Sequence, residues 1–231
     1  MIVVTGGTKG IGKAIIHKFA QAGHAVAVCA RNEQDLMALK TEVESTYGIK
    51  VYAQPADLSK KEEAMKFIDF VLQTGEEVDI LVNNTGVFVP GAIHEEEDGV
   101  LEMVMQTNLY SAYYLSRGFI KGMKERQEGH IFNIASVAGI MAYPNGGTYA
   151  ISKHAMMGLS KCLREELKPH NIKVTSIMPG ATYTASWDGV ELPEDRFSKP
   201  EDVADVVYAS YILSDRSCVE EVVIRPQLGD L

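Results

Sequence analysis

Tyr149 and Lys153 are the residues of this chain whose types and spacing most directly suggest chemistry. They lie four residues apart where the pattern predicts the start of a helix, so both side chains should lie on one helix face. A phenol titrates near pH ~10, and a neighbouring ammonium group favours the phenolate and lowers that pKa. Such a shift suits general acid–base catalysis at neutral pH. A tyrosine and a lysine also meet at this spacing by chance, so the interpretation depends on the surrounding elements.

The elements that must position this pair alternate between strands and helices along the chain. Short apolar runs predict strands at residues 2–4, 24–30, 50–54, 78–82, 130–134, 172–178 and 219–224. Amphipathic segments predict helices between them, and the helix that begins at Tyr149 runs to about Lys168. Nearly continuous apolar strands that alternate with helices indicate a parallel sheet covered on both faces. The predicted fold class is therefore α/β, with a doubly wound parallel sheet in one domain over residues 1–231.

Polar residues mark several helix ends. Asn32 precedes the second helix as an N-cap, and Gly48 follows its end. Ser59 and Glu62 form a capping-box pattern for the next helix. The segment from about Leu101 to Arg126 is predicted as one long helix.

The composition excludes several classes of protein. A chain of 231 residues with 46% hydrophobic residues can bury one substantial core. Its net charge of -9, without a basic stripe, argues against a nucleic-acid partner. Cys29, Cys162 and Cys218 are too few and too scattered for a disulfide framework or a zinc site. No run of ~18 apolar residues and no signal-peptide pattern is present, which predicts a cytoplasmic protein without a membrane segment.

A glycine-rich turn follows the first predicted strand. Gly6, Gly10 and Gly12 allow the backbone to approach a ligand closely, and the following helix offers free N–H groups to a pyrophosphate. The spacing is G-x-x-x-G-x-G rather than the common dinucleotide fingerprint G-x-G-x-x-G. A tight structural turn is the alternative interpretation.

These motifs, in this order, resemble those of the short-chain dehydrogenase/reductase family. The turn from Thr5 to Gly12 matches T-G-x-x-x-G-x-G, and residues 83–86 match N-N-A-G with Thr85 in place of alanine. Tyr149 and Lys153 match Y-x-x-x-K. The remaining matches are Asn108, Ser136 and the pair Pro179-Gly180. The resemblance covers essentially the whole chain, and it implies a Rossmann-type oxidoreductase that moves hydride between a nicotinamide cofactor and a carbonyl substrate.

The resemblance also implies four catalytic roles. Tyr149 donates a proton to the substrate oxygen, assisted by Lys153, which also holds the ribose hydroxyls of the cofactor. Ser136 orients and polarises the carbonyl, and Asn108 positions a water that links Lys153 to solvent. From residue types alone, Asn108 is better interpreted as a structural helix residue and Ser136 as an ordinary turn serine.

The end of the second strand predicts which cofactor is used. A carboxylate at this place accepts hydrogen bonds from the ribose 2′-hydroxyl of NAD, but this chain has Arg31 there. Lys9 would face the same ribose, and two cations suit the 2′-phosphate of NADPH. The alternative is that both are solvated surface cations, since Glu33 and Asp35 lie nearby. Asp57 would lie beside the adenine. The expected cofactor contacts are Gly6, Thr8, Lys9, Gly10, Ile11, Gly12, Arg31, Asn32, Asp57, Leu58, Asn83, Gly86, Tyr149, Lys153, Pro179, Gly180, Thr182 and Thr184.

Aromatic residues and an unusual tail mark the expected substrate side. Only residues 185–197 separate the segment 179–184 from the next helix, which predicts a comparatively open pocket. The tail from Val219 to Asp230 lacks the family's V-D-G-G ending, and with the Tyr-Thr-x-x-Trp stretch it resembles sepiapterin-reductase-like members. The candidate apolar walls, for which plain packing is the alternative, are Phe88, Tyr143, Tyr183 and Trp187.

Three functions remain open from the sequence. The first is NADPH-dependent reduction of a small carbonyl compound, with pterin-like compounds included. The second is reduction of a 3-oxoacyl thioester, which the net charge of -9 disfavours because the acyl carrier is acidic. The third is a cofactor-sensing regulator without catalysis, which would be expected to have lost Tyr149 or Lys153.

Two helices predict self-association. The segment from about Leu101 to Arg126 and the helix that begins at Tyr149 carry more apolar and small residues than one stripe against a sheet uses. Family members pair these helices with their twofold mates, so the resemblance implies a homodimer or homotetramer. The alternative is that both helices are fully covered within one subunit.

Overall fold

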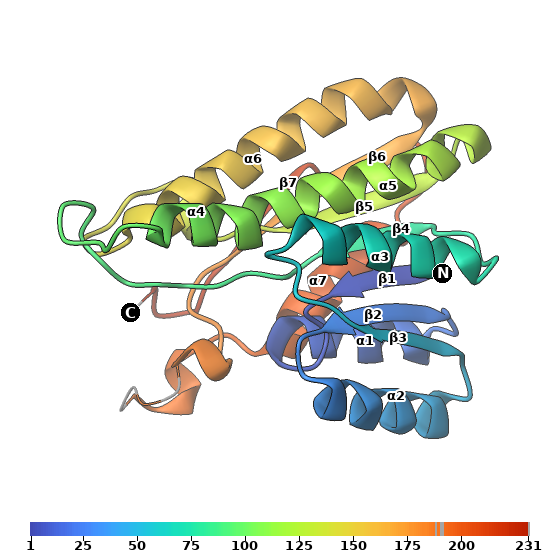
Figure 1. Cartoon of the computed structure of the whole chain (residues 1–231), viewed down its shortest axis with the longest axis horizontal. Coiled ribbons are helices and arrows are strands. Elements are labelled where there is room, and N and C mark those ends of the chain that lie inside the picture. Colours follow the sequence, from blue (N-terminus) through green and yellow to red (C-terminus); the bar gives the residue numbers. More distant parts are fainter. Residues whose placement is uncertain (188, 190–191, 231) are drawn as a thin grey trace.

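The predicted parallel sheet is present in the computed structural model, which describes residues 1–187, 189 and 192–230. Within that part of the chain, seven parallel strands lie in the order β3-β2-β1-β4-β5-β6-β7 (Figure 1). The sheet order reverses at β1 and β4, as in a doubly wound fold. The strands are β1 Ile2–Thr5, β2 Val26–Ala30, β3 Val51–Pro55, β4 Ile80–Asn83, β5 Gly129–Ile134, β6 Ile172–Pro179 and β7 Glu221–Ile224.

Helices cover both faces of this sheet, which confirms the predicted fold class. In Figure 1, the helices α3, α5 and α6 lie in the upper half, whereas α2 lies at the bottom. The helices are α1 Gly10–Gln21, α2 Glu33–Tyr47, α3 Lys61–Gln73, α4 Val100–Met105, α5 Ser111–Arg126, α6 Gly147–Leu167 and α7 Pro200–Tyr211.

Alternate residues of the strands build two separate cores. Val3 of β1 packs in a cluster with Phe67 of α3 and Phe119 of α5. Its neighbours Ile2 and Val4 pack on the opposite face, in the cluster that contains residues of α1, α2 and α7. All four residues of β1 are buried, because a strand in a sheet covered on both faces has no solvent side.

The predicted caps of α2 are confirmed, but the one predicted for α3 is wrong. The Asn32 side chain accepts a hydrogen bond from the Asp35 amide at 2.9 Å, and Gly48 ends the helix in the left-handed conformation. The hydroxyl of Ser59 instead donates to the Asp57 carboxylate at 2.7 Å, and α3 begins after Lys60. The aspartate competes for the serine hydroxyl two residues away, so no capping box forms.

The long helix predicted from about Leu101 to Arg126 is present, but it contains one irregular turn. A π-helical turn, Gln106–Tyr110, separates α4 from α5, and Asn108 lies inside it with a wholly buried side chain. Such turns insert an extra residue into a helix and are frequent at functional sites. Among the helices of the described residues, none combines the length and the apolar character that a membrane span requires.

Candidate active site

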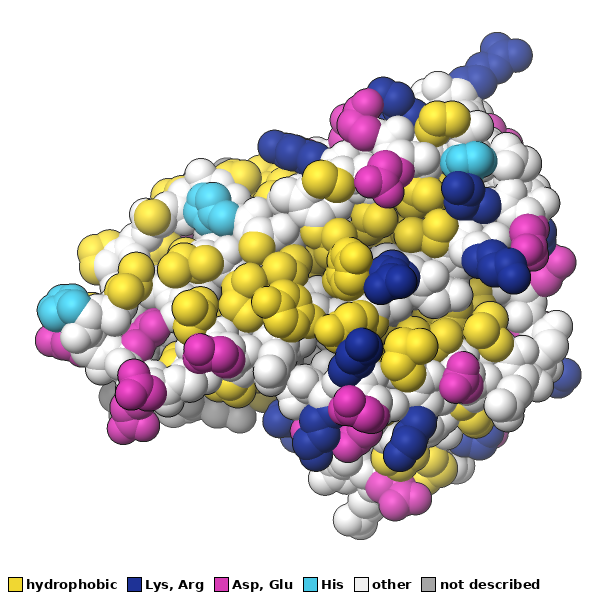
Figure 2. Space-filling model, turned by 45° about the horizontal axis from the view of Figure 1, so that its top comes forward, with side chains coloured by type: hydrophobic (Ala, Val, Ile, Leu, Met, Phe, Trp, Pro, Cys, Tyr) yellow, Lys and Arg dark blue, Asp and Glu magenta, His cyan; other side chains and the backbone are white. Residues whose placement is uncertain are grey.

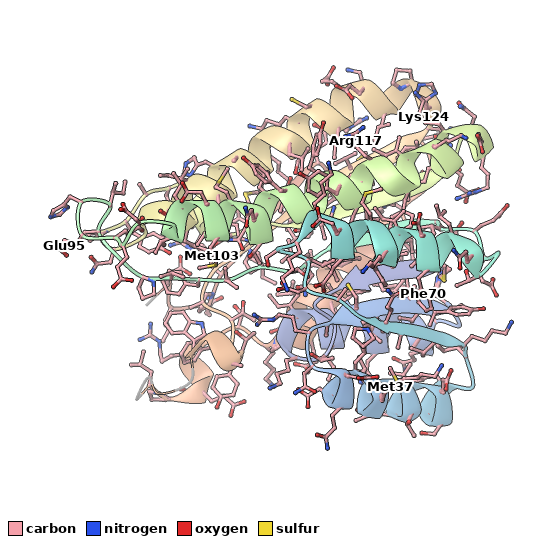
Figure 3. The ribbon with its side chains drawn as sticks, in the orientation of Figure 1. Met37, Phe70, Glu95, Met103, Arg117 and Lys124 are labelled. Atoms are coloured by element: carbon pink, nitrogen blue, oxygen red, sulfur yellow. The ribbon has the colours of Figure 1, made fainter. Side chains whose placement is uncertain are left out.

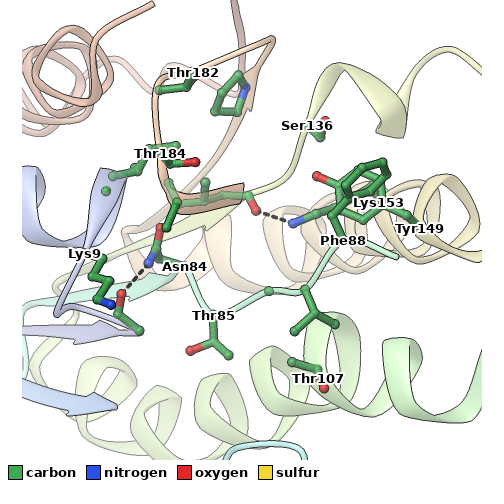
Figure 4. Close-up of a pocket in the computed structure, with 18 of the residues that line it drawn as sticks. Lys9, Asn84, Thr85, Phe88, Thr107, Ser136, Tyr149, Lys153, Thr182 and Thr184 are labelled. Atoms are coloured by element: carbon green, nitrogen blue, oxygen red, sulfur yellow. Dashed lines mark hydrogen bonds between the residues drawn. The ribbon is translucent and has the colours of Figure 1, made fainter. Parts of the chain in front are cut away.

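A cleft of about 1030 Å³ lies at the carboxyl ends of the strands, where the sheet order reverses. Its lining includes Lys9 and Arg31 as well as Tyr149 and Trp187. Figure 4 shows Lys9 on one side of this cleft and Tyr149 and Lys153 on the other. The glycine turn and the pair Tyr149 and Lys153 therefore share one cleft.

The glycine turn lines part of the cleft. Gly6 and Gly10 adopt positive φ angles of 64° and 52°, which favour glycine. A side chain at Gly12 would bring its Cβ to 2.6 Å from the Gly6 carbonyl oxygen, so the turn tolerates no larger residue there. Helix α1 has no side-chain cap at Lys9 and no acidic residue in its first turn. The first residues of α1, Gly10 and Ile11, line the cleft, and a helix N-terminus without a side-chain cap fits a pyrophosphate.

Two consecutive asparagines at the end of β4 point in different directions. The Asn84 side chain donates to the Gly6 carbonyl at 3.1 Å, and the backbone amide of Asn84 donates to the Thr5 hydroxyl at 2.9 Å. Asn84 thus fastens the glycine turn to β4. Asn83 instead donates to Ser116 at 3.2 Å and to Asn133 at 2.8 Å, beneath the sheet. Because successive strand residues face opposite sides, Asn83 does not line the cleft as expected, and Asn84 does.

Two cations, Lys9 and Arg31, and two carboxylates, Asp35 and Asp57, line the part of the cleft where the adenosine of a cofactor was expected. Lys9 and the exposed Arg31 both line the cleft, together with Asp35. The Lys9 ammonium lies 3.7 Å from the Asp35 carboxylate, so that acid partly balances the pair. At Asp57, burial favours the neutral acid, but the hydrogen bonds from Ser59 together with the charge of Lys60 outweigh it and lower the pKa of Asp57. An ionised Asp57 can accept hydrogen bonds from a ligand here.

Helix α6 presents Tyr149 and Lys153 to the cleft on one face, as predicted. The Lys153 ammonium nitrogen lies 5.7 Å from the centre of the Tyr149 ring. It donates a hydrogen bond of 2.9 Å to the Ile134 carbonyl at the end of β5 (Figure 4). Burial lowers the pKa of Lys153 to about 8.

The expected lowering of the Tyr149 pKa is not what this environment produces. Burial raises the pKa of Tyr149 to about 12, while the Ser136 hydroxyl acts in the opposite direction. Phe88 packs edge-on against the phenol ring, with 4.9 Å between ring centres, and contributes to this burial. Desolvation outweighs the distant ammonium, so the phenol of the chain alone keeps its proton at neutral pH.

Ser136 and Asn108 are held by the backbone around them. The Ser136 hydroxyl accepts from the Ala138 amide at 3.1 Å and lines the cleft. Asn108 accepts from the Val87 amide at 2.8 Å and donates to the Val87 carbonyl at 3.0 Å. Asn108 therefore lies behind the cleft wall. A Cβ built on Gly86 would lie 3.5 Å from both Asn108 Oδ1 and Lys153 Nζ, so these two polar atoms converge at Gly86.

Most of the expected site residues line the cleft together, but Gly12, Asn83 and Asn108 do not. Among the expected aromatic walls, Tyr183 lies outside the cleft and packs against Phe197, with 5.6 Å between ring centres. The expected open segment 185–197 is described only in part, and Asp188, Val190 and Glu191 lie outside the described residues. The expected site residues that line the cleft are Gly6, Thr8, Lys9, Gly10, Ile11, Arg31, Asn32, Asp57, Leu58, Gly86, Ser136, Tyr149, Lys153, Pro179, Gly180, Thr182 and Thr184, and the expected aromatic walls that line it are Phe88, Tyr143 and Trp187.

A sequence model described as short chain dehydrogenase matches residues 1–194. The chain belongs to the short-chain dehydrogenase family. Sepiapterin reductase of Chlorobaculum tepidum is 30% identical over 239 residues, which span all of this chain and 98% of that protein. The 3-oxoacyl-(acyl-carrier-protein) reductase of Aquifex aeolicus is 29% identical and covers 92% of each chain.

Solved structures of this family superpose closely on the chain. A metagenomic short-chain oxidoreductase in complex with NADP has a TM-score of 0.85 and 32% identity, and the match covers 98% of this chain and 97% of that one. This structural neighbour of the short-chain dehydrogenase is thus a complex with NADP.

The tail of this short-chain dehydrogenase enters the cleft, which sequence reasoning missed. The Asp230 carboxylate accepts from the Ala181 amide at 3.1 Å and forms an ion pair of 2.6 Å with Arg225. Both side chains line the cleft. The sequence of this tail departs from the family's usual ending, which marks the segment as unusual. That departure does not predict where the tail lies in the fold.

Proposed function

We propose that this short-chain dehydrogenase is an NADPH-dependent reductase of small carbonyl compounds. The observation that carries the proposal is the convergence of Tyr149, Lys153 and Ser136 in one cleft with the glycine turn. When bound, the reduced nicotinamide supplies hydride to the carbonyl carbon. Lys9 and Arg31 would hold a 2′-phosphate, and the NADP in the metagenomic relative supports this choice.

The chain's own residues would then handle the proton. Tyr149 would donate its phenolic proton to the carbonyl oxygen, and its raised pKa keeps that proton available at neutral pH. Ser136 would hold the same oxygen through its hydroxyl. Lys153 and Asn108, which converge at Gly86, would return a proton to Tyr149 through a water.

The tail favours a polar substrate. Asp230 offers a carboxylate and Arg225 a guanidinium at the substrate half of the cleft, so a ring with adjacent donors and acceptors would bind there. The 2-amino-4-oxo ring of a pterin has this chemistry, and the relative from Chlorobaculum tepidum is a sepiapterin reductase. We therefore propose sepiapterin-like compounds as the first substrates to test.

Reduction of a 3-oxoacyl thioester is the second candidate, because the Aquifex aeolicus relative carries that activity in its name. Asp230→Asn separates the two. It should raise the KM for a sepiapterin-like ketone about tenfold, since a charge-assisted hydrogen bond is lost, and should leave a 3-oxoacyl thioester unaffected. Turnover of the thioester alone would favour the second candidate. A regulator without catalysis would show no turnover with any carbonyl compound.

Tyr149→Phe tests the proposed chemistry. Turnover of a carbonyl panel, followed by NADPH absorbance, should fall by about a thousandfold, within the range that general acid catalysis contributes. The affinity for NADPH should stay close to that of the wild type. Turnover within about tenfold of the wild type, a barrier change of only ~1.4 kcal/mol, would refute Tyr149 as the proton donor.

A further inference from the structure

The N-terminus of helix α6, which carries Tyr149 in its first turn, has no cap from its own neighbourhood. Gly146 precedes the helix and offers no side chain, and no acidic residue lies in the first turn. The first amide groups of a helix need partners from elsewhere, and an anionic group is the most favourable one.

Glu96 supplies that partner from a loop 52 residues earlier. Its carboxylate accepts a hydrogen bond from the Thr148 amide at 3.0 Å and another from the Thr148 hydroxyl. The hydroxyl bond and then the amide bond lower the pKa of Glu96, so the carboxylate is ionised at neutral pH. The contact lies directly beside Tyr149 in the chain.

The backbone around this contact leaves room only for glycine. Gly147 has a φ of 36°, and a Cβ on it would lie 2.3 Å from the Glu96 carboxylate and 2.4 Å from the Gly91 carbonyl. The Gly91 amide also donates to the Asn145 carbonyl at 3.1 Å. The loop is therefore seated on the start of α6 at two points.

The same loop forms a wall of the cleft. Its first part is fixed by Asn108, which holds both the amide and the carbonyl of Val87. Phe88 follows and packs edge-on against the Tyr149 ring. The segment from Val87 to Glu96 is thus tied at both ends, with Phe88 against the phenol between them.

Glu96 differs from the acidic residues beside it. Glu95, Glu97 and Asp98 are exposed, and Glu95 points away from α6 at the outer end of the loop (Figure 3). Glu96 alone of these four turns inward to α6. Glu95 therefore offers a matched control.

We propose that Glu96 is a positioning residue, which caps α6 and sets the place of the Tyr149 phenol and of Phe88. The inference rests on the proposed function, in which Tyr149 donates the proton. A displaced phenol would slow proton transfer, while the adenosine half of the cleft would be unchanged, since Glu96 does not line it.

Glu96→Ala, Glu96→Gln and Glu95→Ala test the proposal in the full-length protein. Glu96→Ala should lower kcat about tenfold, equivalent to ~1.4 kcal/mol, and should raise the solvent deuterium isotope effect on kcat. Its NADPH dissociation constant should stay within about twofold of the wild type. Glu96→Gln keeps an oxygen for the Thr148 amide and should retain activity within about threefold. Glu95→Ala should behave as the wild type.

A double-mutant cycle with Thr148→Val adds a second readout. Because the two side chains form one contact, the losses of kcat in Glu96→Ala and Thr148→Val should not add in the double variant. The inference is overturned by a Glu96→Ala enzyme with the kcat and isotope effect of Glu95→Ala, by additive losses, or by a Glu96→Gln enzyme as slow as Glu96→Ala. If Tyr149→Phe retains turnover, the proposed role of Tyr149 fails. If Tyr149→Phe loses turnover but the Glu96 variants keep the kcat of the wild type, only the inference about Glu96 fails.

Discussion

The ammonium group of Lys153 donates a hydrogen bond of 2.9 Å to the carbonyl oxygen of Ile134. This bond joins the start of α6 to the carboxyl end of β5, since Ile134 is the last residue of β5 and lies two residues before Ser136. The position of Lys153 relative to the cleft is therefore set by the sheet as well as by its own helix. The same burial that fixes the side chain also disfavours its charge.

Lys153→Met should abolish most turnover and stabilise the fold. With a pKa lowered to about 8, the folded state binds the proton more weakly than the unfolded chain, in which lysine titrates near ~10.4. The desolvation cost is thus fully present below about pH 8 and is relieved as the pH rises to ~10.4. Lys153→Met removes this desolvation cost but also loses the hydrogen bond to Ile134. We therefore expect the free energy of unfolding at pH 7 to rise by about 1 to 2 kcal/mol. Denaturant titration measures it.

Lys161→Met is the matched control for that experiment, because Lys161 is on the same helix but exposed. It should change neither turnover nor stability appreciably. A Lys153→Met protein less stable than this control would contradict the prediction.

Arg31→Asp should shift cofactor preference from NADPH to NADH. A carboxylate at the end of β2 repels a 2′-phosphate and accepts from a 2′-hydroxyl. We expect the ratio of kcat/KM for NADPH to kcat/KM for NADH to fall by about tenfold or more in Arg31→Asp. In Arg31→Gln, this ratio should lie between those of the wild type and of Arg31→Asp. Steady-state rates with both cofactors test this. A wild type that already prefers NADH would show that Lys9 and Arg31 do not select the phosphate.

His130 should make the fold sensitive to mild acid. The ring is buried in β5, stacks on Phe132 with 3.8 Å between ring centres, and has its pKa lowered to about 3, first by burial and then by Lys173. The folded state therefore stays unprotonated while the unfolded chain takes up a proton below about pH 6.5. Stability is lost as the pH falls from about 6.5 to about 3, at roughly 1.4 kcal/mol per pH unit.

His130→Phe removes this titration and keeps an aromatic ring beside Phe132. Between pH 7 and pH 5, the wild type should lose about 2 kcal/mol more of its free energy of unfolding than the variant. Denaturant titrations of both proteins at the two pH values give the difference. Parallel losses would show that other groups control the acid response.

Self-association should use the face made by α4, α5 and α6. Much of the apolar surface expected there, including Leu115 and Phe119, is buried within the subunit. Hydrophobic side chains remain exposed on this side of the molecule, as Figure 2 shows. They belong to Leu101, Met103, Tyr110, Tyr113 and Ile151. A twofold pairing of this face would bury them.

Light scattering at micromolar concentration should give at least twice the 25.3 kDa mass of one chain. Tyr113→Glu should shift the mass to that of one chain, because a buried unpaired carboxylate disfavours the interface. Met37→Glu, on α2 at the other end of the molecule in Figure 3, should leave the mass unchanged. A fully active wild type of 25.3 kDa would contradict the expected assembly.

The repeating elements and much of the site followed from local patterns in the sequence. Strand and helix periods, the Asn32 and Gly48 caps, and the four-residue spacing of Tyr149 and Lys153 each depend on neighbours a few residues away. Ser136 was singled out by the family resemblance and not by a local pattern, and it shares the cleft with the glycine turn because parallel strands end at the same edge of the sheet.

Only the tertiary structure decided how distant side chains combine. The Ala181 amide donates to Asp230 across 49 residues and the Thr148 amide donates to Glu96 across 52, and no local period encodes such pairs. The raised pKa of Tyr149 is likewise a property of everything packed around the phenol, so the spacing to Lys153 predicted its direction wrongly. Desolvation sums over the whole environment, whereas sequence spacing reports one neighbour.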